Sequence, residues 1–127
     1  DWVYISRQNA NTRRVVNYAE VEAVLEKYGV QPVRCEDLSL EEEIRLFSTV
    51  DGVIGPHGAG LTATVWGSDL CFLEIFNDIG KAPYYVLAHI LGHNYTAYSA
   101  NSVEKVDNER NRNMIVDLDN LEKYLKR

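Results

Sequence analysis

The sequence has 127 residues, of which 46% are hydrophobic and 25% charged, a balance typical of a soluble globular domain and not of a disordered chain. Its formal net charge of −6 argues against a nucleic-acid-binding domain, because such domains depend on clustered Lys and Arg. It contains no apolar run as long as a membrane span and opens on Asp, so we expect one domain, residues 1–127, excised from a longer protein.

Strand and helix patterns alternate through the first half of the chain. Asn17 and Glu20 have the offset of a capping box, at the start of a helix that Gly29 ends. Ser39 and Glu42 form a second capping box, which opens another helix. Apolar runs predict three strands, over residues 2–6, 30–35 and 52–55.

The second half continues the same alternation. Pro83 suits the first turn of a helix that stops at Gly92, and Asp119 with Glu122 predicts the cap of a last helix. Residues 101–112 are polar and without pattern, which predicts an exposed loop. Further strands are expected over residues 70–76 and 95–99, and a short strand or loop entry over 114–118.

Two cysteines, Cys35 and Cys71, fall in apolar strand patterns without metal-ligand spacing. We interpret them as buried free thiols of a protein in a reducing compartment, and so expect a cytoplasmic location. A disulfide between them is the alternative.

Strands that alternate with helices predict an α/β fold of Rossmann-like, doubly wound type. Its sheet is expected to be mainly parallel, with helices on both faces. Ligands of such folds bind outside the carboxyl ends of the strands.

A glycine-rich turn, "GPHGAGLTATVW", follows the predicted third strand and leads into a short helix over residues 61–66. It is not a P-loop, a dinucleotide fingerprint or a nucleophile elbow. Backbone N–H groups and a helix N-terminus at a strand end predict an anion site, where His57 could donate a hydrogen bond or carry a proton. A tight turn with a capping histidine is the alternative.

Charged residues are expected at the same edge of the sheet. Arg7, Arg13 and Arg14 follow the first strand, and guanidinium groups match phosphate oxygens, although solvated surface charge is the alternative. Glu74 interrupts the apolar run "CFLEIF". At the rim of the sheet it could accept the hydroxyls of a ribose, and a salt bridge to an arginine is the other interpretation.

Several of these segments, taken in order, resemble the C-terminal domain of glycosyltransferase family 61, which includes capsular-polysaccharide biosynthesis proteins and protein O-linked sugar transferases. The resemblance covers roughly residues 3–98. Its most specific element is the His-Gly-Ala-Gly-Leu-Thr run at 57–62. The segments are "YISR", Arg14 with "VVNYAEVEAVL", "EDLSLEEEIRLFSTVDGVIGPHGAGLT", "CFLEIF" and "YYVLAHILGHNY".

The resemblance implies the donor-binding half of an inverting glycosyltransferase of GT-B type that uses a nucleotide sugar in polysaccharide or capsule biosynthesis. His57 is the candidate catalytic group, and Ala63 stands where the family usually has Asn or His. The candidate substrate- and nucleotide-binding residues are Arg7, Arg14, His57, Gly58, Ala59, Gly60, Leu61 and Glu74.

The expected partners are a nucleotide-sugar donor, a glycan acceptor and an N-terminal domain of the same protein. The parent protein could associate with a membrane. No cofactor and no divalent metal are expected, because arginines and a helix N-terminus can offset the charge of a diphosphate. Two alternatives remain open: a non-catalytic module that binds a nucleotide or nucleotide sugar, and a plain flavodoxin-like interaction domain with dispersed charges.

Overall fold

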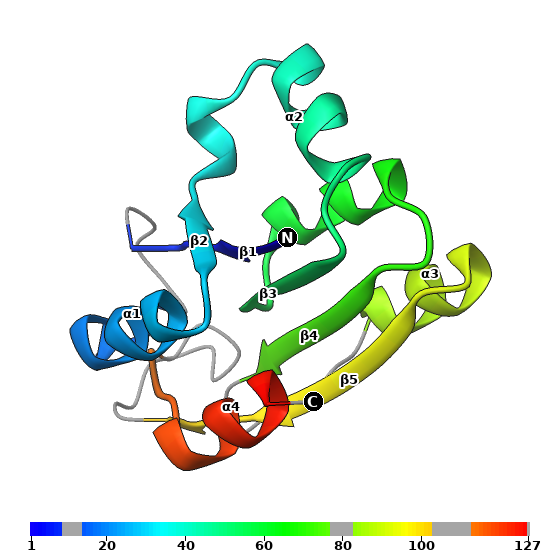
Figure 1. Cartoon of the computed structure of the whole chain (residues 1–127). Coiled ribbons are helices and arrows are strands. Elements are labelled where there is room, and N and C mark those ends of the chain that lie inside the picture. Colours follow the sequence, from blue (N-terminus) through cyan, green and yellow to red (C-terminus); the bar gives the residue numbers. More distant parts are fainter. Residues whose placement is uncertain (9–13, 77–82, 103–112, 127) are drawn as a thin grey trace.

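The computed structural model describes residues 1–8, 14–76, 83–102 and 113–126, and its centre is a parallel five-stranded sheet (Figure 1). The strand order is β2-β1-β3-β4-β5, and every neighbouring pair is parallel. The strands are β1 (Trp2–Ile5), β2 (Val30–Val33), β3 (Gly52–Pro56), β4 (Cys71–Phe76) and β5 (Asn94–Ser99).

Helices cover both faces of this sheet, as the sequence predicts. On one face α1 and α4 lie side by side, and on the other face α2 and α3 flank the 3₁₀ helix η2 (Figure 1). The helices are η1 (Cys35–Asp37), α1 (Tyr18–Lys27), α2 (Leu40–Phe47), η2 (Ala59–Trp66), α3 (Pro83–Leu91) and α4 (Leu118–Leu125). The α/β, doubly wound prediction is therefore confirmed.

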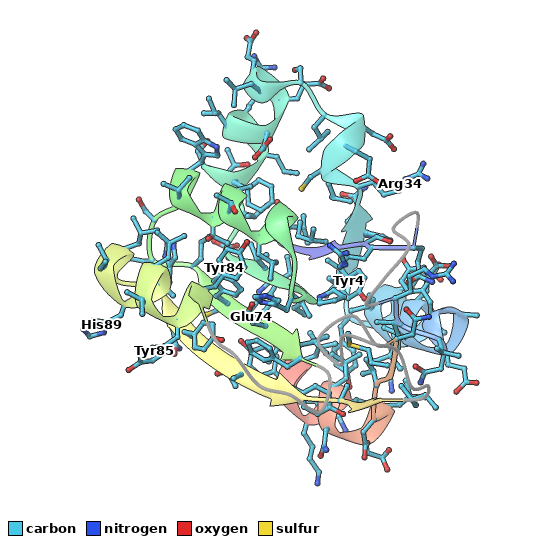
Figure 2. All side chains as sticks on the ribbon, turned by 180° about the vertical axis from the view of Figure 1, so that it is seen from behind. Tyr4, Arg34, Glu74, Tyr84, Tyr85 and His89 are labelled. Atoms are coloured by element: carbon cyan, nitrogen blue, oxygen red, sulfur yellow. The ribbon has the colours of Figure 1, made fainter. Side chains whose placement is uncertain are left out.

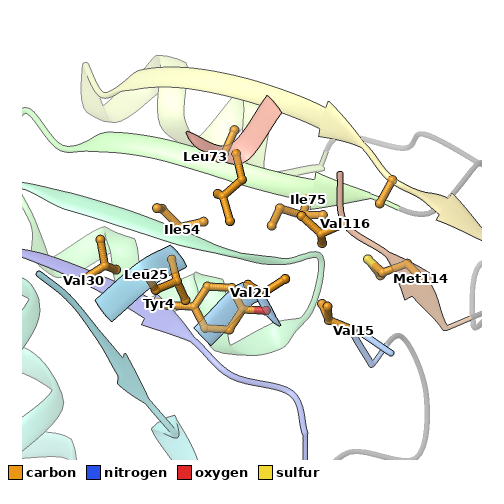
Figure 3. Packing of buried hydrophobic residues seen from close by; sticks show 12 residues of the cluster. Tyr4, Val15, Val21, Leu25, Val30, Ile54, Leu73, Ile75, Met114 and Val116 are labelled. Atoms are coloured by element: carbon orange, nitrogen blue, oxygen red, sulfur yellow. The ribbon is translucent and has the colours of Figure 1, made fainter. Parts of the chain in front are cut away.

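Alternating side chains of the strands supply two apolar cores, one on each face. Figure 3 shows the core under α1 and α4, in which Tyr4, Ile54 and Leu73 of three adjacent strands meet Val21 and Leu25 of α1. The opposite core holds the residues next to them along the strands and closes against α2, η2 and α3. Both faces are thus buried, which is why the strand sequences are almost continuously apolar.

The order of the strands reverses between β1 and β3. From β1 the chain crosses to β2 on one side, and from β2 it returns to place β3 on the other side of β1. Crossovers that leave on opposite faces open a crevice at the carboxyl ends of the two central strands. The predicted glycine turn follows β3 at this point.

Two of the predicted helix caps are wrong. Asn17 makes no cap to α1; its amide instead donates to the Val116 carbonyl at 2.9 Å and accepts from the Val116 N–H at 3.0 Å. Helix α4 starts earlier than predicted, and its cap is Asp117, which accepts from the Asn120 N–H at 3.1 Å. The Ser39–Glu42 capping box of α2 is confirmed, with both of its hydrogen bonds present.

The segment after β5 returns toward α1. Strand β6 (Asn101–Ser102) pairs antiparallel with β7 (Met114–Ile115), and Val15 forms an isolated bridge with Met114. The short strand predicted within 114–118 is therefore confirmed, outside the main sheet. The predicted loop is a strand at 101–102, and its remainder, 103–112, lies outside the described residues.

No disulfide joins the two cysteines, so the alternative of a disulfide does not hold. Each is half-buried instead of fully buried. Cys71 begins β4, whereas Cys35 lies in the 3₁₀ turn η1 and not in a strand, because β2 ends two residues earlier.

Candidate functional site

The carboxyl ends of β1 and β3 bring the first candidate residues together. Tyr4 of β1 is in register with Ile54 of β3, so Arg7 and His57 each stand three residues beyond a matched pair. Both lie at the same edge of the sheet, where the order of the strands reverses.

Arg7 lies directly against the backbone of the glycine turn. A Cβ atom added to Gly58 would stand 2.2 Å from the Arg7 Nη1 atom, which is closer than any side chain allows. The backbone of Gly58 is extended, so it requires no glycine for conformational reasons. Gly58 is therefore the residue that makes room for a guanidinium group at the N-terminus of η2.

The backbone of the turn offers N–H groups, but not the one at His57. The His57 N–H donates to the Ile75 carbonyl at 2.8 Å, which ties the turn to β4. The Leu61 N–H donates to the Gly58 carbonyl at 3.1 Å and closes the first turn of η2. The N–H groups of residues 58–60 precede that bond and have no acceptor within the helix, which is the arrangement found where helix N-termini bind anions.

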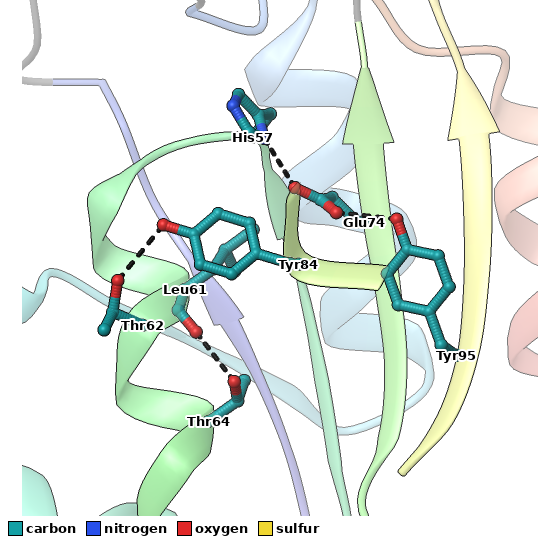
Figure 4. Close-up of polar contacts among 7 residues, drawn as sticks. All are labelled: His57, Leu61, Thr62, Thr64, Glu74, Tyr84 and Tyr95. Atoms are coloured by element: carbon teal, nitrogen blue, oxygen red, sulfur yellow. Dashed lines mark hydrogen bonds and ion pairs between the residues drawn. The ribbon is translucent and has the colours of Figure 1, made fainter. Parts of the chain in front are cut away.

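His57 is held from beneath by a buried carboxylate (Figure 4). Its Nδ1 atom lies 2.6 Å from Oε2 of Glu74, and Oε1 of Glu74 accepts a hydrogen bond from the Tyr95 hydroxyl at 2.6 Å. Glu74 is wholly buried, while the side chain of His57 is 22% exposed. Together these contacts form a chain from β5 through β4 to the edge of the sheet.

Aromatic rings enclose the imidazole of His57. The ring of Phe76 stacks on it at 5.3 Å between centroids, and Tyr84 of α3 meets it edge-on at 5.5 Å. The Tyr84 hydroxyl lies 3.1 Å from the Thr62 Oγ1 atom, so α3 is joined to η2 beside the histidine (Figures 2 and 4).

The position of Glu74 corrects the expectation of a carboxylate at the rim. Glu74 is in register with Gly55 of β3 and Ala97 of β5, so it belongs to the body of the sheet. Its two oxygens are bonded to His57 and Tyr95 instead of the arginine that the sequence offered as an alternative. Because Glu74 is also wholly buried, a ribose at the surface of the chain cannot reach its oxygens.

The electrostatics of Tyr95 fit a hydroxyl that keeps its proton. Burial raises the pKa of Tyr95 well above its ordinary value, and the hydrogen bond and charge of Glu74 raise it further. The hydroxyl therefore donates to the carboxylate throughout the physiological range of pH.

The other candidates divide between core and surface. Leu61 is fully buried, so only its backbone could meet a ligand, and the surroundings of Ala59 and Gly60 are outside the description. Arg14 is fixed through its backbone, whose N–H donates to Asn113 Oδ1 at 2.9 Å, and its side chain is exposed. Arg13 lies outside the described residues.

A polar cavity of about 400 Å³ lies at the carboxyl ends of β1 and β2, and the two residues that flank Arg7 in the chain line it. Its wall includes the Arg34–Asp37 ion pair, with 3.0 Å between Nε and Oδ2. The lining residues are Ser6, Gln8, Tyr18, Glu22, Pro32, Arg34 and Asp37. Sequence reasoning did not single out any of them.

Tyr84 and Tyr95 are further residues of the site that sequence reasoning missed. Both stand in patterns that the sequence explains as apolar faces of a helix and a strand. The only available signal was Glu74 itself, because a carboxylate inside an apolar strand needs donors from neighbouring elements.

Among the described residues, no three His, Cys, Asp or Glu side chains gather as metal ligands would. The Asp-x-Asp spacing at Asp117 and Asp119 lies at the start of α4, where Asp117 is the helix cap. None of the described helices is both long enough and apolar enough to span a membrane.

Comparisons with known proteins point to one family and one fold. The model of the family Glycosyltransferase 61 matches residues 1–71, from β1 to the first residue of β4. The chain is 34% identical, over 99 residues, to the Drosophila melanogaster EGF domain-specific O-linked N-acetylglucosamine transferase. That match covers 75% of this chain and 19% of the relative, so the chain spans about a fifth of that protein's length.

A solved structure has the same fold at low sequence identity. The Clostridium botulinum CMP N-glycosidase BcmB superposes with a TM-score of 0.50 and 13% sequence identity, over 87% of this chain and 94% of that one. At this identity the likeness concerns the arrangement of strands and helices alone.

Proposed function

The chain belongs to the glycosyltransferase 61 family, and from that premise we propose that it is the donor-binding domain of an inverting glycosyltransferase of GT-B type. In this proposal residues 1–127 bind a nucleotide sugar, and another part of the protein binds the acceptor. The acceptor is a glycan, as in polysaccharide or capsule biosynthesis, and the protein acts in the cytoplasm.

The contact between Arg7 and Gly58 is the observation that carries this proposal. It brings a guanidinium group to the N-terminus of η2, in the crevice where the order of the strands reverses. A guanidinium fork and backbone N–H groups are complementary to the oxygens of a diphosphate. We place the diphosphate here, with the exposed Arg14 as a further cation from the segment before α1.

The polar cavity beside Arg7 suits the nucleoside. It lies on the β2 side of the same edge, and a volume of about 400 Å³ is in the range of small-molecule sites. A nucleotide whose diphosphate lies at Gly58 and passes Arg7 would extend into this cavity. The hydroxyl and carboxylate groups of the cavity wall would then face the ribose. This position replaces the ribose contact that the sequence led us to expect at Glu74.

His57 stands on the other side of the diphosphate, toward β4. A protonated Nε2 atom there stabilises the charge that develops on the leaving phosphate as the glycosidic bond breaks. His57 is accordingly assigned to the leaving group and not to the acceptor. Deprotonation of the acceptor hydroxyl then falls to a group outside this site.

The sugar is the least constrained part of the donor. The Drosophila relative is named for the transfer of O-linked N-acetylglucosamine, so nucleotide-linked N-acetylglucosamine is the first donor to test. The same name makes a protein hydroxyl an acceptor to test beside glycans.

The test is a panel of nucleoside diphosphates and nucleotide sugars, with thermal stabilisation as the first readout and calorimetry as the second. A ligand at a hundred times its dissociation constant stabilises the folded chain by about 2.7 kcal/mol. Arg7→Gln is expected to weaken the best ligand at least tenfold, because it removes a charge-assisted bidentate contact. Chelation of divalent metals is expected to leave the affinity unchanged.

Matched controls separate the site from general charge effects. Arg45→Gln removes an exposed arginine of α2 that pairs only with Glu41 among the described residues, and it is expected to bind like the wild type. Gly58→Val displaces the Arg7 guanidinium and is expected to abolish binding, whereas Lys123→Ala on α4 is not. Equal affinities of the Arg7 and Arg45 variants would contradict the proposed site, and binding without transfer by the full-length protein would favour a non-catalytic module.

A further inference from the structure

The contacts beneath His57 fix more than its position. Each oxygen of the Glu74 carboxylate has one partner, His57 Nδ1 on one side and the Tyr95 hydroxyl on the other, both at 2.6 Å. Glu74 lies in the middle of β4. Its partner His57 directly follows the end of β3, and its partner Tyr95 lies at the start of β5. A carboxylate held at both oxygens cannot rotate, so the imidazole that it bonds has one preferred orientation.

The same contacts select one tautomer of the histidine. The Tyr95 hydroxyl donates to Oε1, and its raised pKa keeps it protonated. An ionised carboxylate only accepts hydrogen bonds, so the remaining oxygen needs a donor, which is Nδ1–H of His57. Nε2 is then the ring nitrogen that faces away from the carboxylate.

We propose that Glu74 and Tyr95 are positioning residues that hold His57 as the Nδ1–H tautomer, so that its Nε2 atom takes up a proton when a diphosphate binds. In the binding step one proton moves from solvent to Nε2, the imidazolium donates from Nε2 to a phosphate oxygen, and its Nδ1–H stays bonded to Glu74. The contact with the diphosphate rests on the proposed function. The tautomer does not, because it follows from the ligand-free contacts alone.

The surroundings of His57 are consistent with this coupling. Glu74 is the charged group of β4 that faces the ring, and Tyr84 of α3 contacts its edge. Arg7 lies against the neighbouring Gly58, so an anion at this turn would meet a guanidinium group as well as His57. Proton uptake on binding means that the affinity for a diphosphate falls as the pH rises.

The first measurement is the tautomer of His57, read by nitrogen-15 NMR of the ligand-free chain at a pH where the ring is neutral. The chain has three histidines, and His57→Gln identifies the signals of the ring concerned. We expect Nδ1–H in the wild type. In Glu74→Gln the Tyr95 hydroxyl still donates to the amide oxygen, so the amide NH₂ faces Nδ1 and the ring proton moves to Nε2. A wild-type ring protonated at Nε2, or a Glu74→Gln ring that keeps Nδ1–H, would overturn the assignment.

The second measurement is calorimetric binding of inorganic pyrophosphate between pH 6 and pH 9. Pyrophosphate itself changes protonation over this range of pH. This change affects every variant equally, so it cancels from the ratio of two variants' affinities at the same pH. At the acid end, Glu74→Gln is expected to bind roughly tenfold more weakly than the wild type, because a charge-assisted bond is lost. That difference is expected to shrink as the pH rises. Equal affinities at every pH would refute the proton coupling.

Further variants keep the result interpretable. Tyr95→Phe frees one carboxylate oxygen without removing the charge, so the ring is expected to keep Nδ1–H. The carboxylate and the imidazole are then less firmly oriented, and binding is expected to weaken severalfold; wild-type affinity would argue against a positioning role for Tyr95. Glu26→Gln makes the same chemical change on the exposed face of α1 and is expected to have no effect. If the wild type shows Nδ1–H but binds neither pyrophosphate nor any nucleoside diphosphate, the proposed function fails while the assignment of the tautomer holds.

Discussion

At the scale of single residues, burial decides what each polar group can do. Glu74 is the clearest case, because a carboxylate in the body of a parallel sheet is tolerated only when both oxygens are bonded. Those bonds make it a structural partner of His57, and its complete burial keeps a ligand from its oxygens. Gly58 shows the converse, since the absent side chain is what admits Arg7.

Cys35 is expected to be a poorly reactive thiol. Burial, with smaller effects from the carboxylates of Glu43 and Glu36, raises its pKa from the ordinary 9.0 to about 11. At pH 8 its thiolate population is then roughly a hundredfold smaller than that of an ordinary thiol, and alkylation should accelerate as the pH rises toward 11.

The measurement is the rate of alkylation by iodoacetamide at pH 8, in a Cys71→Ala variant that leaves Cys35 as the only thiol of the chain. The same variant in urea supplies the reference rate of an unfolded thiol. Equal rates in the two conditions would show that the fold does not protect Cys35.

At the scale of secondary-structure elements, the ends of helices carry the long-range connections. The start of α1 is joined to the segment before α4 by the two hydrogen bonds between Asn17 and the backbone of Val116. Lys27 and Tyr28, at the other end of α1, both bond Glu122 of α4. The C-terminal helix is thereby fastened across residues that are almost a hundred positions apart.

Asn17→Ala is expected to lower the free energy of unfolding by about 2 kcal/mol, because it leaves the buried backbone groups of Val116 without partners. Asn17→Asp keeps the acceptor and loses the donor, and should cost less than the alanine variant if water reaches the Val116 carbonyl. The measurement is the midpoint of urea unfolding.

Asn120→Ala is the matched control, since its side chain is exposed on α4. It is expected to change the free energy of unfolding by no more than about 0.5 kcal/mol. A loss of the same size in the Asn17 and Asn120 variants would mean that the hydrogen bonds between Asn17 and Val116 make no specific contribution to the free energy of unfolding.

At the scale of the whole molecule, the reversal of strand order decides where a ligand can bind. Five parallel strands place the ends of β1, β3 and β4 at one edge, and the crossovers from β1 and to β3 leave a crevice between them. The residues that we assign to the diphosphate, to the leaving group and to the nucleoside all lie along this edge.

We expect the chain alone to bind the donor and to transfer no sugar. An inverting transfer needs a base beside the acceptor hydroxyl. Glu74 is buried in the body of the sheet with both oxygens bonded, and the proposed site assigns His57 to the leaving group. The chain also spans only about a fifth of its Drosophila relative, which leaves room for a base elsewhere in a longer protein.

Turnover of nucleotide-linked N-acetylglucosamine, with protein and glycan acceptors, should be compared between this chain and the full-length protein. The His57→Gln variant of the full-length protein serves as the control for the leaving-group role, and its kcat should fall more than its affinity for the donor. Comparable turnover by the isolated chain would show that the chemistry is complete within these residues.

The sequence by itself determined the fold class and the sheet edge at which we place the candidate site. Alternating patterns identified all five strands of the sheet, and a glycine turn after the third strand marked its carboxyl end, because periodicity and turn chemistry are local properties. Ser39 and Glu42 were recognisable as a cap for the same reason: both partners lie within one turn.

Only the tertiary structure decided which groups are partners. The side chain of Asn17 had a local cap within reach, yet it bonds Val116, and Glu74 is satisfied by His57 and Tyr95 instead of an arginine. These choices depend on which elements pack side by side, and that follows from the order of the strands and not from the spacing along the chain. A buried polar group bonds the donors and acceptors that the fold brings within about 3 Å of it. A single sequence does not show which residues come that close.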